Sequence, residues 1–306
     1  MRLSLVAFLF LSCLWCTSEK KHNNAELSLP ISLSDTQFKP LRELVDAGLQ
    51  SRLQQVLIQD SNWSRLISNK KMAVGVVDLR DPAHTKFARV NGDVMMYAAS
   101  LPKLAVLLAS CEAIHAGTLQ DTPKIQADLK LMVSRSNNPA ATRMIDKLGF
   151  AQIERVLTSS HYKLYDPRQG GGFWVGKRYA HTGKRYPDPL KGLTHAASVT
   201  QACRFYYLLA LGRLVNEQES RRMLDILSDP EIEHKFVLTL KELAPEARLY
   251  RKSGTWRQWH SDSVLVWGPD WRRYILVGLI EDSNGEHILR ELVRVVEDVL
   301  GDGGGR

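Results

Sequence analysis

Cysteine is scarce in this sequence of 306 residues, which contains four. Cys13 and Cys16 lie in the first 18 residues, so the rest of the chain holds only Cys111 and Cys203. No cysteines or histidines cluster at the spacing of a metal site, so we expect no metal. Cys111 and Cys203 each fall within an amphipathic helical pattern, and we expect buried free thiols, although export would permit a disulfide between them.

Long apolar runs are also rare. Apart from the 13 residues Leu3–Trp15, none approaches the 18 or so that a membrane-spanning helix needs, so we expect no membrane span. The exception follows a single positive charge and ends near small residues, which is typical of an export signal over residues 1–18. Residues 19–38 are polar and are expected to form a linker.

A second interpretation of the first residues remains open. The segment Leu11–Cys13 loosely resembles a lipoprotein cleavage box, which would make Cys13 a lipid-anchored first residue. We therefore expect an exported protein, either periplasmic or secreted, with a lipoprotein as the alternative.

Acidic residues are fewer than basic ones, 33 against 41, which gives a net charge of +8. One irregular stretch carries much of the excess, because it opposes Asp166 and Asp188 with the basic residues Lys163, Arg168, Lys177, Arg178, Lys184, Arg185 and Lys191. Such a patch is usually solvated surface, but it also attracts substrates that bear a carboxylate. The export signal and the lack of a recognised binding fold exclude nucleic acid as a partner.

The hydrophobic pattern predicts an α+β fold with a helical block between two groups of strands. A helical stripe runs from Leu41 to Leu57, and a final amphipathic helix covers Glu286–Leu300. The expected strands lie at 71–79, 85–90, 247–254, 263–268 and 273–281. We expect them to form one five-stranded antiparallel sheet, flanked by the terminal helices, with an all-helical subdomain inserted between the second and third strands.

This pattern predicts one domain over residues 39–303. Its α/β part covers about 39–99 and 244–303, and its helical part covers about 100–243, with an irregular stretch between about 160 and 194. We see no internal repeat and expect a monomer.

The segment "YAASLPKLAVLL" places Ser100 and Lys103 at the start of an apolar helix. Pro102 fits only the first turn of a helix, so Ser100 and Lys103 should lie one turn apart on one face. There the amine can reach the hydroxyl, which is how a serine is activated without histidine. The alternative is a helix-capping serine with a solvated lysine.

Two later motifs support the interpretation of Ser100 as an activated nucleophile. "SRSNNPAATRMIDKLG" places Ser136, Asn137 and Asn138 at the entry to a helix, and "LYRKSGTW" places Lys252, Ser253 and Gly254 at the end of a strand. In this order, the three motifs resemble the S-x-x-K, S-D-N and K-T-G set of serine β-lactamases and penicillin-binding D,D-peptidases. The similarity is greatest to class A β-lactamases and extends over roughly residues 40–300. Taken singly, each motif could instead be a helix-capping turn or a strand end.

The resemblance implies a role for each matching residue. Ser100 would be the acylated nucleophile, and Lys103 the base or part of it. Ser136 would pass a proton to the leaving nitrogen, with Lys252 holding Ser136 polarised.

The remaining positions would bind substrate. Lys252 and Ser253 would face a carboxylate, and Asn138 would hydrogen-bond the amide of the acyl side chain. The backbone N–H groups of Ser100 and Thr255, the residue after Gly254, would form the oxyanion hole.

One family feature is missing, because we find no E-x-x-L-N motif to supply the glutamate that activates water for deacylation. Asp188 and Asp166, each followed by proline, are the candidates for that base, but turn formation is the alternative for both. His195 and His260 are possible accessory residues, or they hold neighbouring backbone in place.

We therefore expect an exported serine hydrolase that forms an acyl-serine intermediate on β-lactam or related amide bonds, without a cofactor and with slow deacylation. The substrate would be a small molecule or peptide bearing a carboxylate. The alternatives are a D,D-peptidase, amidase or esterase on cell-wall or small acyl substrates, and a sensor that binds penicillin or cell wall without turnover.

Overall fold

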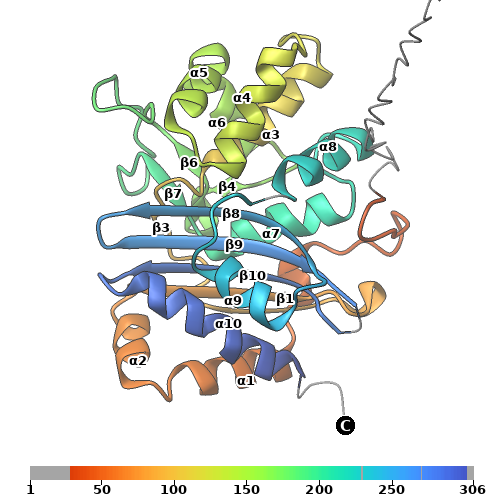
Figure 1. Cartoon of the computed structure of the whole chain (residues 1–306), viewed down its shortest axis with the longest axis vertical. Helices are drawn as coiled ribbons and strands as arrows, with labels where there is room; N and C mark the ends of the chain where they lie inside the picture. Colours follow the sequence, from red (N-terminus) through yellow and green to blue (C-terminus); the bar gives the residue numbers. More distant parts are fainter. Residues whose placement is uncertain (1–27, 229, 270, 302–306) are drawn as a thin grey trace, which may run out of the picture.

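The computed structural model describes residues 28–228, 230–269 and 271–301. Its centre is a five-stranded sheet in the order β2-β1-β10-β9-β8, with every neighbouring pair antiparallel (Figure 1). The strands are β1 (Met72–Asp78), β2 (Lys86–Val90), β8 (Arg248–Trp256), β9 (Trp259–Trp267) and β10 (Arg273–Glu281). The predicted sheet is therefore confirmed, including the insertion of the helical block between its second and third strands.

One face of the sheet is covered by helices from both ends of the chain and by the helix that precedes β8 (Figure 1). These are α1 (Ala47–Leu57), α2 (Ser61–Ser68), α9 (Phe236–Leu243) and α10 (Gly285–Gly301). The predicted helical stripe is interrupted, because a short 3-10 helix (Leu41–Leu44) precedes extended Val45 and α1 starts only after Asp46. The Asp46 carboxylate accepts a hydrogen bond from the Leu49 N–H at 2.7 Å, so it caps α1 and fixes the break.

The other face packs against α7 (Val199–Ala210) and the helical block. The block contains α3 (Lys103–His115), α4 (Pro123–Ser134), α5 (Asn138–Leu148), α6 (Phe150–Thr158) and α8 (Glu217–Leu227). A Cβ on Gly75 of β1 would lie 2.7 Å from the Cys203 sulfur, so the glycine lets α7 approach the sheet closely. Cys111 and Cys203 are buried free thiols, and the disulfide that export would permit is not formed.

The irregular stretch contributes strands to two small sheets that the sequence did not reveal. A three-stranded sheet orders β3 (Met96–Tyr97), β7 (His195–Ala197) and β6 (Trp174–Val175), and a second sheet pairs β4 (Tyr165–Asp166) with β5 (Gly171–Gly172). The Ala98 N–H also donates to the His195 carbonyl oxygen at 2.8 Å. The end of the long loop is thereby tied to the turn that carries Ser100.

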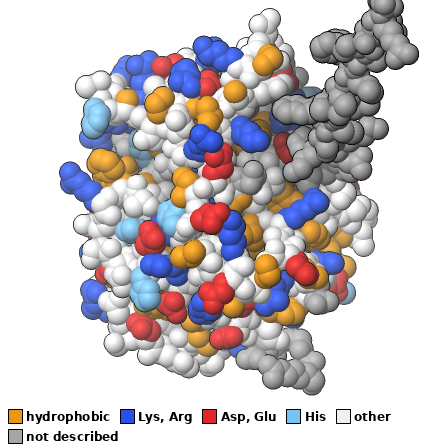
Figure 2. All heavy atoms as spheres, in the orientation of Figure 1, with side chains coloured by type: hydrophobic (Ala, Val, Ile, Leu, Met, Phe, Trp, Pro, Cys, Tyr) orange, Lys and Arg blue, Asp and Glu red, His pale blue; other side chains and the backbone are white. Residues whose placement is uncertain are grey.

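The outer surface carries mixed charge. On the face shown in Figure 2, Lys and Arg side chains alternate with Asp and Glu over most of the area. Within the described ranges, no helix is both long enough and apolar enough to cross a bilayer.

Candidate active site

Ser100 lies in a tight turn between β3 and α3. The N–H groups of Lys103, Leu104 and Ala105 each bond to the carbonyl three residues earlier, at 3.2, 3.1 and 2.9 Å. The helix starts at Lys103 after Pro102, and no side chain caps it. Ser100 is therefore not the cap of α3, and its half-buried hydroxyl is left for other contacts.

The end of β8 presses against this turn. A Cβ on Gly254 would lie 2.4 Å from the Ala98 carbonyl oxygen and 2.5 Å from the Ser100 nitrogen, so only glycine fits. The Ser261 hydroxyl, on β9, donates to the same Ala98 carbonyl at 2.8 Å. Between them, Ala99 adopts a left-handed φ of 49°, which is strained for a residue with a side chain.

Thr255 follows Gly254 at the free edge of the sheet, because β8 is the last strand. A two-residue turn, Arg257 and Gln258, joins β8 to β9. In hairpins of this kind the residues that flank the turn, here Trp256 and Trp259, form a hydrogen-bonded pair. Antiparallel alternation then turns the Thr255 N–H outward, beside the Ser100 turn. The Ser100 nitrogen and Thr255 therefore lie on either side of Gly254.

The Lys103 amine points into the protein. It donates to the Ser136 carbonyl oxygen at 2.6 Å, to Asn138 Oδ1 at 2.8 Å and to Ser136 Oγ at 3.3 Å, rather than to Ser100. The side chain is fully buried, and burial lowers the pKa of Lys103 from 10.5 to about 7. A large fraction of this lysine is therefore a free amine at neutral pH.

Lys252 approaches Ser136 from the opposite side. Its amine donates to Ser136 Oγ at 2.9 Å and to the Ser253 carbonyl oxygen at 2.7 Å. The pKa of Lys252 is well below its usual range, first because of burial and then because of the nearby Lys103 charge. Within the described residues, no carboxylate forms an ion pair with either lysine.

Ser136, Asn137 and Asn138 have two different structural roles. Asn137 caps α5, since its side-chain oxygen accepts from the Ala140 N–H at 2.8 Å. Ser136 adopts a left-handed φ of 52°, and it and Asn138 both reach Lys103. The capping alternative therefore holds for Asn137, while its two neighbours face the lysines.

Lys235 is a site residue that the sequence did not indicate. It is fully buried and donates to the Gly254 carbonyl oxygen at 2.6 Å, to Thr255 Oγ1 at 2.8 Å and to the Ser261 carbonyl oxygen at 3.2 Å. Burial lowers the pKa of Lys235 to about 8. The Ser253 hydroxyl lies 3.4 Å from His234 Nε2. Both contacts hold the strand end that carries Thr255.

Asp188 is buried, and its carboxylate is already occupied. Oδ1 accepts from the Leu190 and Lys191 N–H groups at 2.9 and 3.0 Å and from the Tyr165 hydroxyl at 3.2 Å. Oδ2 accepts from the Leu193 N–H at 2.6 Å. This is the geometry of a turn-forming aspartate, and none of its partners belongs to the Lys103–Ser136–Lys252 cluster.

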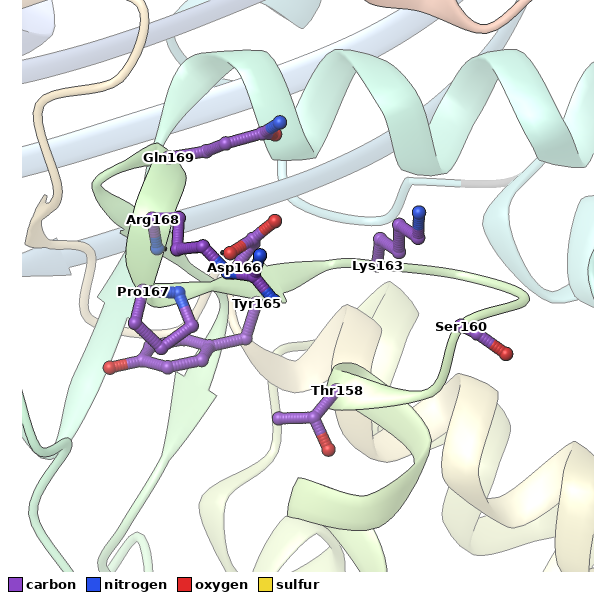
Figure 3. A pocket seen from close by; sticks show the side chains of 8 residues that line it. All are labelled: Thr158, Ser160, Lys163, Tyr165, Asp166, Pro167, Arg168 and Gln169. Carbon is purple, nitrogen blue, oxygen red and sulfur yellow. Dashed lines mark hydrogen bonds between the residues drawn. The ribbon is translucent and has the colours of Figure 1, made fainter.

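Asp166 also serves its own turn, accepting from the Arg168 N–H at 2.9 Å. Figure 3 shows it in a surface pocket beside Lys163, Tyr165 and Arg168. None of the residues carried over from the three motifs lines this pocket.

The two histidines occupy different sides of the sheet's end. His195 is buried, with Nε2 lying 3.1 Å from the Lys177 carbonyl oxygen, and burial lowers its pKa to about 4. His260 pairs with Thr255 across β8 and β9 and packs under Gly285 at the start of α10. His195 contacts the long loop beside Lys103, whereas His260 lies on the face covered by α10.

Comparison with known proteins gives a consistent result at the level of fold and family. Among solved structures, PBP-A matches at a TM-score of 0.61 and 19% identity over 84% of this chain and 97% of its own. A variant of PBP-A in an acyl-enzyme complex with penicillin G matches at 0.63 and 19%, over 87% and 100%. A beta-lactamase from Sphaerobacter thermophilus matches at 0.60 and 18%, over 82% and 97%.

At these identities the solved structures show a shared fold. No curated protein matches the chain. The model of the Beta-lactamase enzyme family matches residues 49–128 and 120–300, which together cover most of the chain and all three motifs. The chain therefore belongs to the beta-lactamase enzyme family and is a serine hydrolase.

Proposed function

We propose that this protein opens β-lactam or related amide bonds through an ester on Ser100, and that it forms this ester faster than it releases it. The observation that carries the proposal is the Ser136 hydroxyl, held between the amines of Lys103 and Lys252 at 3.3 and 2.9 Å. This arrangement supports proton transfer for acylation, and within the described residues no carboxylate bonds to either amine.

Acylation follows from these contacts. Ser100 Oγ bonds to the carbonyl carbon while its proton passes to the neutral Lys103 amine. The C–N bond then breaks, and the leaving nitrogen takes the proton of the Ser136 hydroxyl, which Lys103 restores. Lys103 ends the step neutral, and Ser100 carries the acyl group. The oxyanion formed on the way is stabilised by the Ser100 and Thr255 N–H groups.

The lysines at the end of β8 favour an anionic substrate. Lys252 bonds to Ser136 and Lys235 to Thr255, and a carboxylate bound beside either amine would favour its charged form. Lys252 and Ser253 would face a carboxylate, and the amide nitrogen of Asn138 remains for an acyl side chain because its oxygen bonds to Lys103. We therefore propose β-lactams or peptide termini as the substrate class.

We propose that deacylation has no positioned base, since Asp188 is committed to four donors and no carboxylate of the described residues bonds to the Lys103–Ser136–Lys252 cluster. A general base typically contributes ~10² to ~10⁴ in rate, so release should lag behind acylation by about that factor. A chromogenic cephalosporin should give a burst near one equivalent per enzyme, then a slow steady state, with a persistent adduct in the intact-protein mass.

Ser100→Ala should abolish burst and adduct, whereas Ser68→Ala, in an exposed S-x-x-K match, should leave both unchanged. Fast turnover without a burst would contradict slow deacylation and indicate an efficient β-lactamase. No adduct with a β-lactam, but Ser100 labelled by a serine-directed phosphonate, would favour the peptidase, amidase or esterase alternative. An adduct that never turns over would favour a sensor.

Export is a separate part of the proposal and rests on the sequence of residues 1–18, which lie outside the described residues. The mass of the mature protein tests it: an N-terminus at Glu19 indicates signal cleavage after Ser18, a diacylated Cys13 indicates a lipoprotein, and an uncut chain contradicts both.

A further inference from the structure

Tyr179 belongs to no motif, yet it reaches the centre of the site. It lies in the loop between β6 and β7, and its hydroxyl donates to the Ala99 carbonyl oxygen at 3.2 Å. Its ring centroid is 4.5 Å from Lys103 Nζ and 4.3 Å from the His195 ring. One side chain thus touches both the base and the backbone beside the nucleophile.

The ring completes the enclosure of the Lys103 amine. Ser136 and Asn138 accept its hydrogen bonds on one side, and the Tyr179 ring covers another. The other titratable groups that face it are Lys252 on β8 and His195 on β7. Among the described residues no carboxylate contacts this amine, and the ring occupies a side that water could otherwise reach.

The hydroxyl acts on a different group. Ala99 holds its left-handed φ of 49° between Ala98, which is bonded to His195 and Ser261, and Ser100. A strained residue keeps its conformation only when its surroundings fix it, and the Tyr179 hydroxyl supplies a bond to the Ala99 carbonyl. The direction of the Ser100 N–H depends on the same peptide unit.

We propose that Tyr179 is a positioning residue for acylation: its ring shields the Lys103 amine from water so that it acts as a free base, and its hydroxyl fixes the peptide that aims Ser100 and its N–H. The proposal rests on the acyl-serine chemistry proposed above. It also assigns a purpose to the long loop, which presents this one side chain to the base.

Two effects of the ring on Lys103 oppose each other. The face of an aromatic ring attracts an ammonium group, which favours protonation, whereas exclusion of water favours the neutral amine. Burial lowers the pKa of Lys103 to about 7, and we expect the ring's share in that burial to outweigh its attraction for the ammonium group. Removing the ring should therefore raise that pKa.

The test separates ring from hydroxyl by comparing Tyr179→Phe with Tyr179→Leu. Tyr186→Phe is the matched control, because this tyrosine lies in the same loop but bonds to Glu154. The Lys103 ammonium is titrated by NMR of ¹³C-labelled lysine, assigned with Lys103→Met, and the rate of Ser100 labelling is measured against pH.

We expect Tyr179→Leu to move the Lys103 midpoint upward by a unit or more, and labelling at pH 7 to fall at least about fivefold as a result. Tyr179→Phe should leave the midpoint in place and lower the plateau rate about threefold to tenfold. Tyr186→Phe should change neither. If Tyr179→Leu folds poorly, Tyr179→Met serves as the second variant without a ring.

An unmoved midpoint in the ring-free variants would overturn the shielding role, and a full plateau rate in Tyr179→Phe would overturn the hydroxyl's role. The NMR titration needs no reaction. If β-lactams fail to acylate the wild type, the midpoints still decide the ring's role, and phosphonate labelling decides the hydroxyl's, while the proposed substrate class alone fails.

Discussion

Two neighbouring residues of β8 carry buried positive charge in opposite ways. Arg251 bonds to both oxygens of Asp262, at 2.7 and 2.8 Å, and both side chains are essentially inaccessible. Lys252 is just as buried but faces the other side of the strand, where its amine meets only the Ser136 hydroxyl and the Ser253 carbonyl oxygen. Alternation along a strand separates the two environments within one residue.

The difference divides the labour between stability and chemistry. A buried guanidinium with a carboxylate partner stays charged and fixes the strand, while a buried amine without one gives up its proton easily. The face that holds Lys103 and Lys252 therefore keeps groups that can move protons. The opposite face holds the Arg251–Asp262 pair, in which the removal of one partner would leave a buried charge uncompensated.

The largest effect should come from removing the base on the unpaired face. Lys103→Met should lower the rate of Ser100 labelling by ~10² to ~10⁴. It should lower the free energy of unfolding at pH 7 by no more than ~1 to ~3 kcal/mol, because the variant leaves the Ser136 and Asn138 acceptors unpaired but breaks no ion pair. Intact-protein mass and urea unfolding measure the two quantities, with exposed Lys86→Met as the control. A marked loss of stability with normal labelling would reverse our assignment of the two faces.

Removing one partner of the Arg251–Asp262 pair should have the opposite effect, a loss of stability with little change in labelling. Asp262→Asn leaves Arg251 buried without a counter-charge, which typically costs ~3 to ~5 kcal/mol of folding free energy. Labelling of the molecules that remain folded should stay within about tenfold of the parent. The control is Glu242→Gln, which removes an exposed partner of Arg294 and should cost less than ~1 kcal/mol. Equal unfolding free energies for the two variants would contradict the comparison.

The pH dependence of labelling gives a further test of the difference between the two faces. Acylation needs the neutral amine, so the rate should rise about tenfold per unit below the Lys103 pKa of about 7 and level off above it. The free energy of unfolding should also rise with pH above about 7. There the folded protein has released the Lys103 proton, whereas the unfolded chain holds it up to about 10.5. A rate that is flat between pH 5 and 8 would show that Lys103 is not the base.

The smallest effect on rate should come from Asp188→Asn. An amide cannot accept from all four donors, so we expect a loss of ~1 to ~3 kcal/mol in unfolding free energy. Deacylation should remain within a few-fold of the parent, because no contact links Asp188 to the lysine cluster. Steady-state turnover of a chromogenic cephalosporin checks this, and its collapse would identify Asp188 as the water-activating base.

Local pattern was sufficient to predict the sheet. The apolar runs that became β10 and the second half of β9 indicated strands, and the motifs fall where strands and helices end. The first part of β9, from Trp259 to Asp262, is mostly polar and was not predicted. The small sheets around His195 escaped prediction because their strands have two or three residues, too short for any periodicity.

Two site residues could not be predicted from the sequence, because they reach the site through contacts between distant segments. Tyr179 and Lys235 carry no motif, and each reaches the site from an irregular segment, 76 positions beyond Lys103 and 20 before Thr255. Arg251 and Lys252 of β8 are likewise two similar cations in the sequence. The neighbouring strand β9 distinguishes them, because it brings Asp262 to Arg251 and not to Lys252.

The close packing of α7 on Gly75 makes Cys203 a built-in reporter of motion. Its thiol is sealed between helix and sheet, whereas Cys111 is sealed within the helical block, and burial raises the pKa of both. A thiol reagent reaches either sulfur only when the surrounding layer opens. The ratio of the two modification rates in native buffer therefore compares the opening of the sheet layer with that of the helical block, in one unmodified molecule.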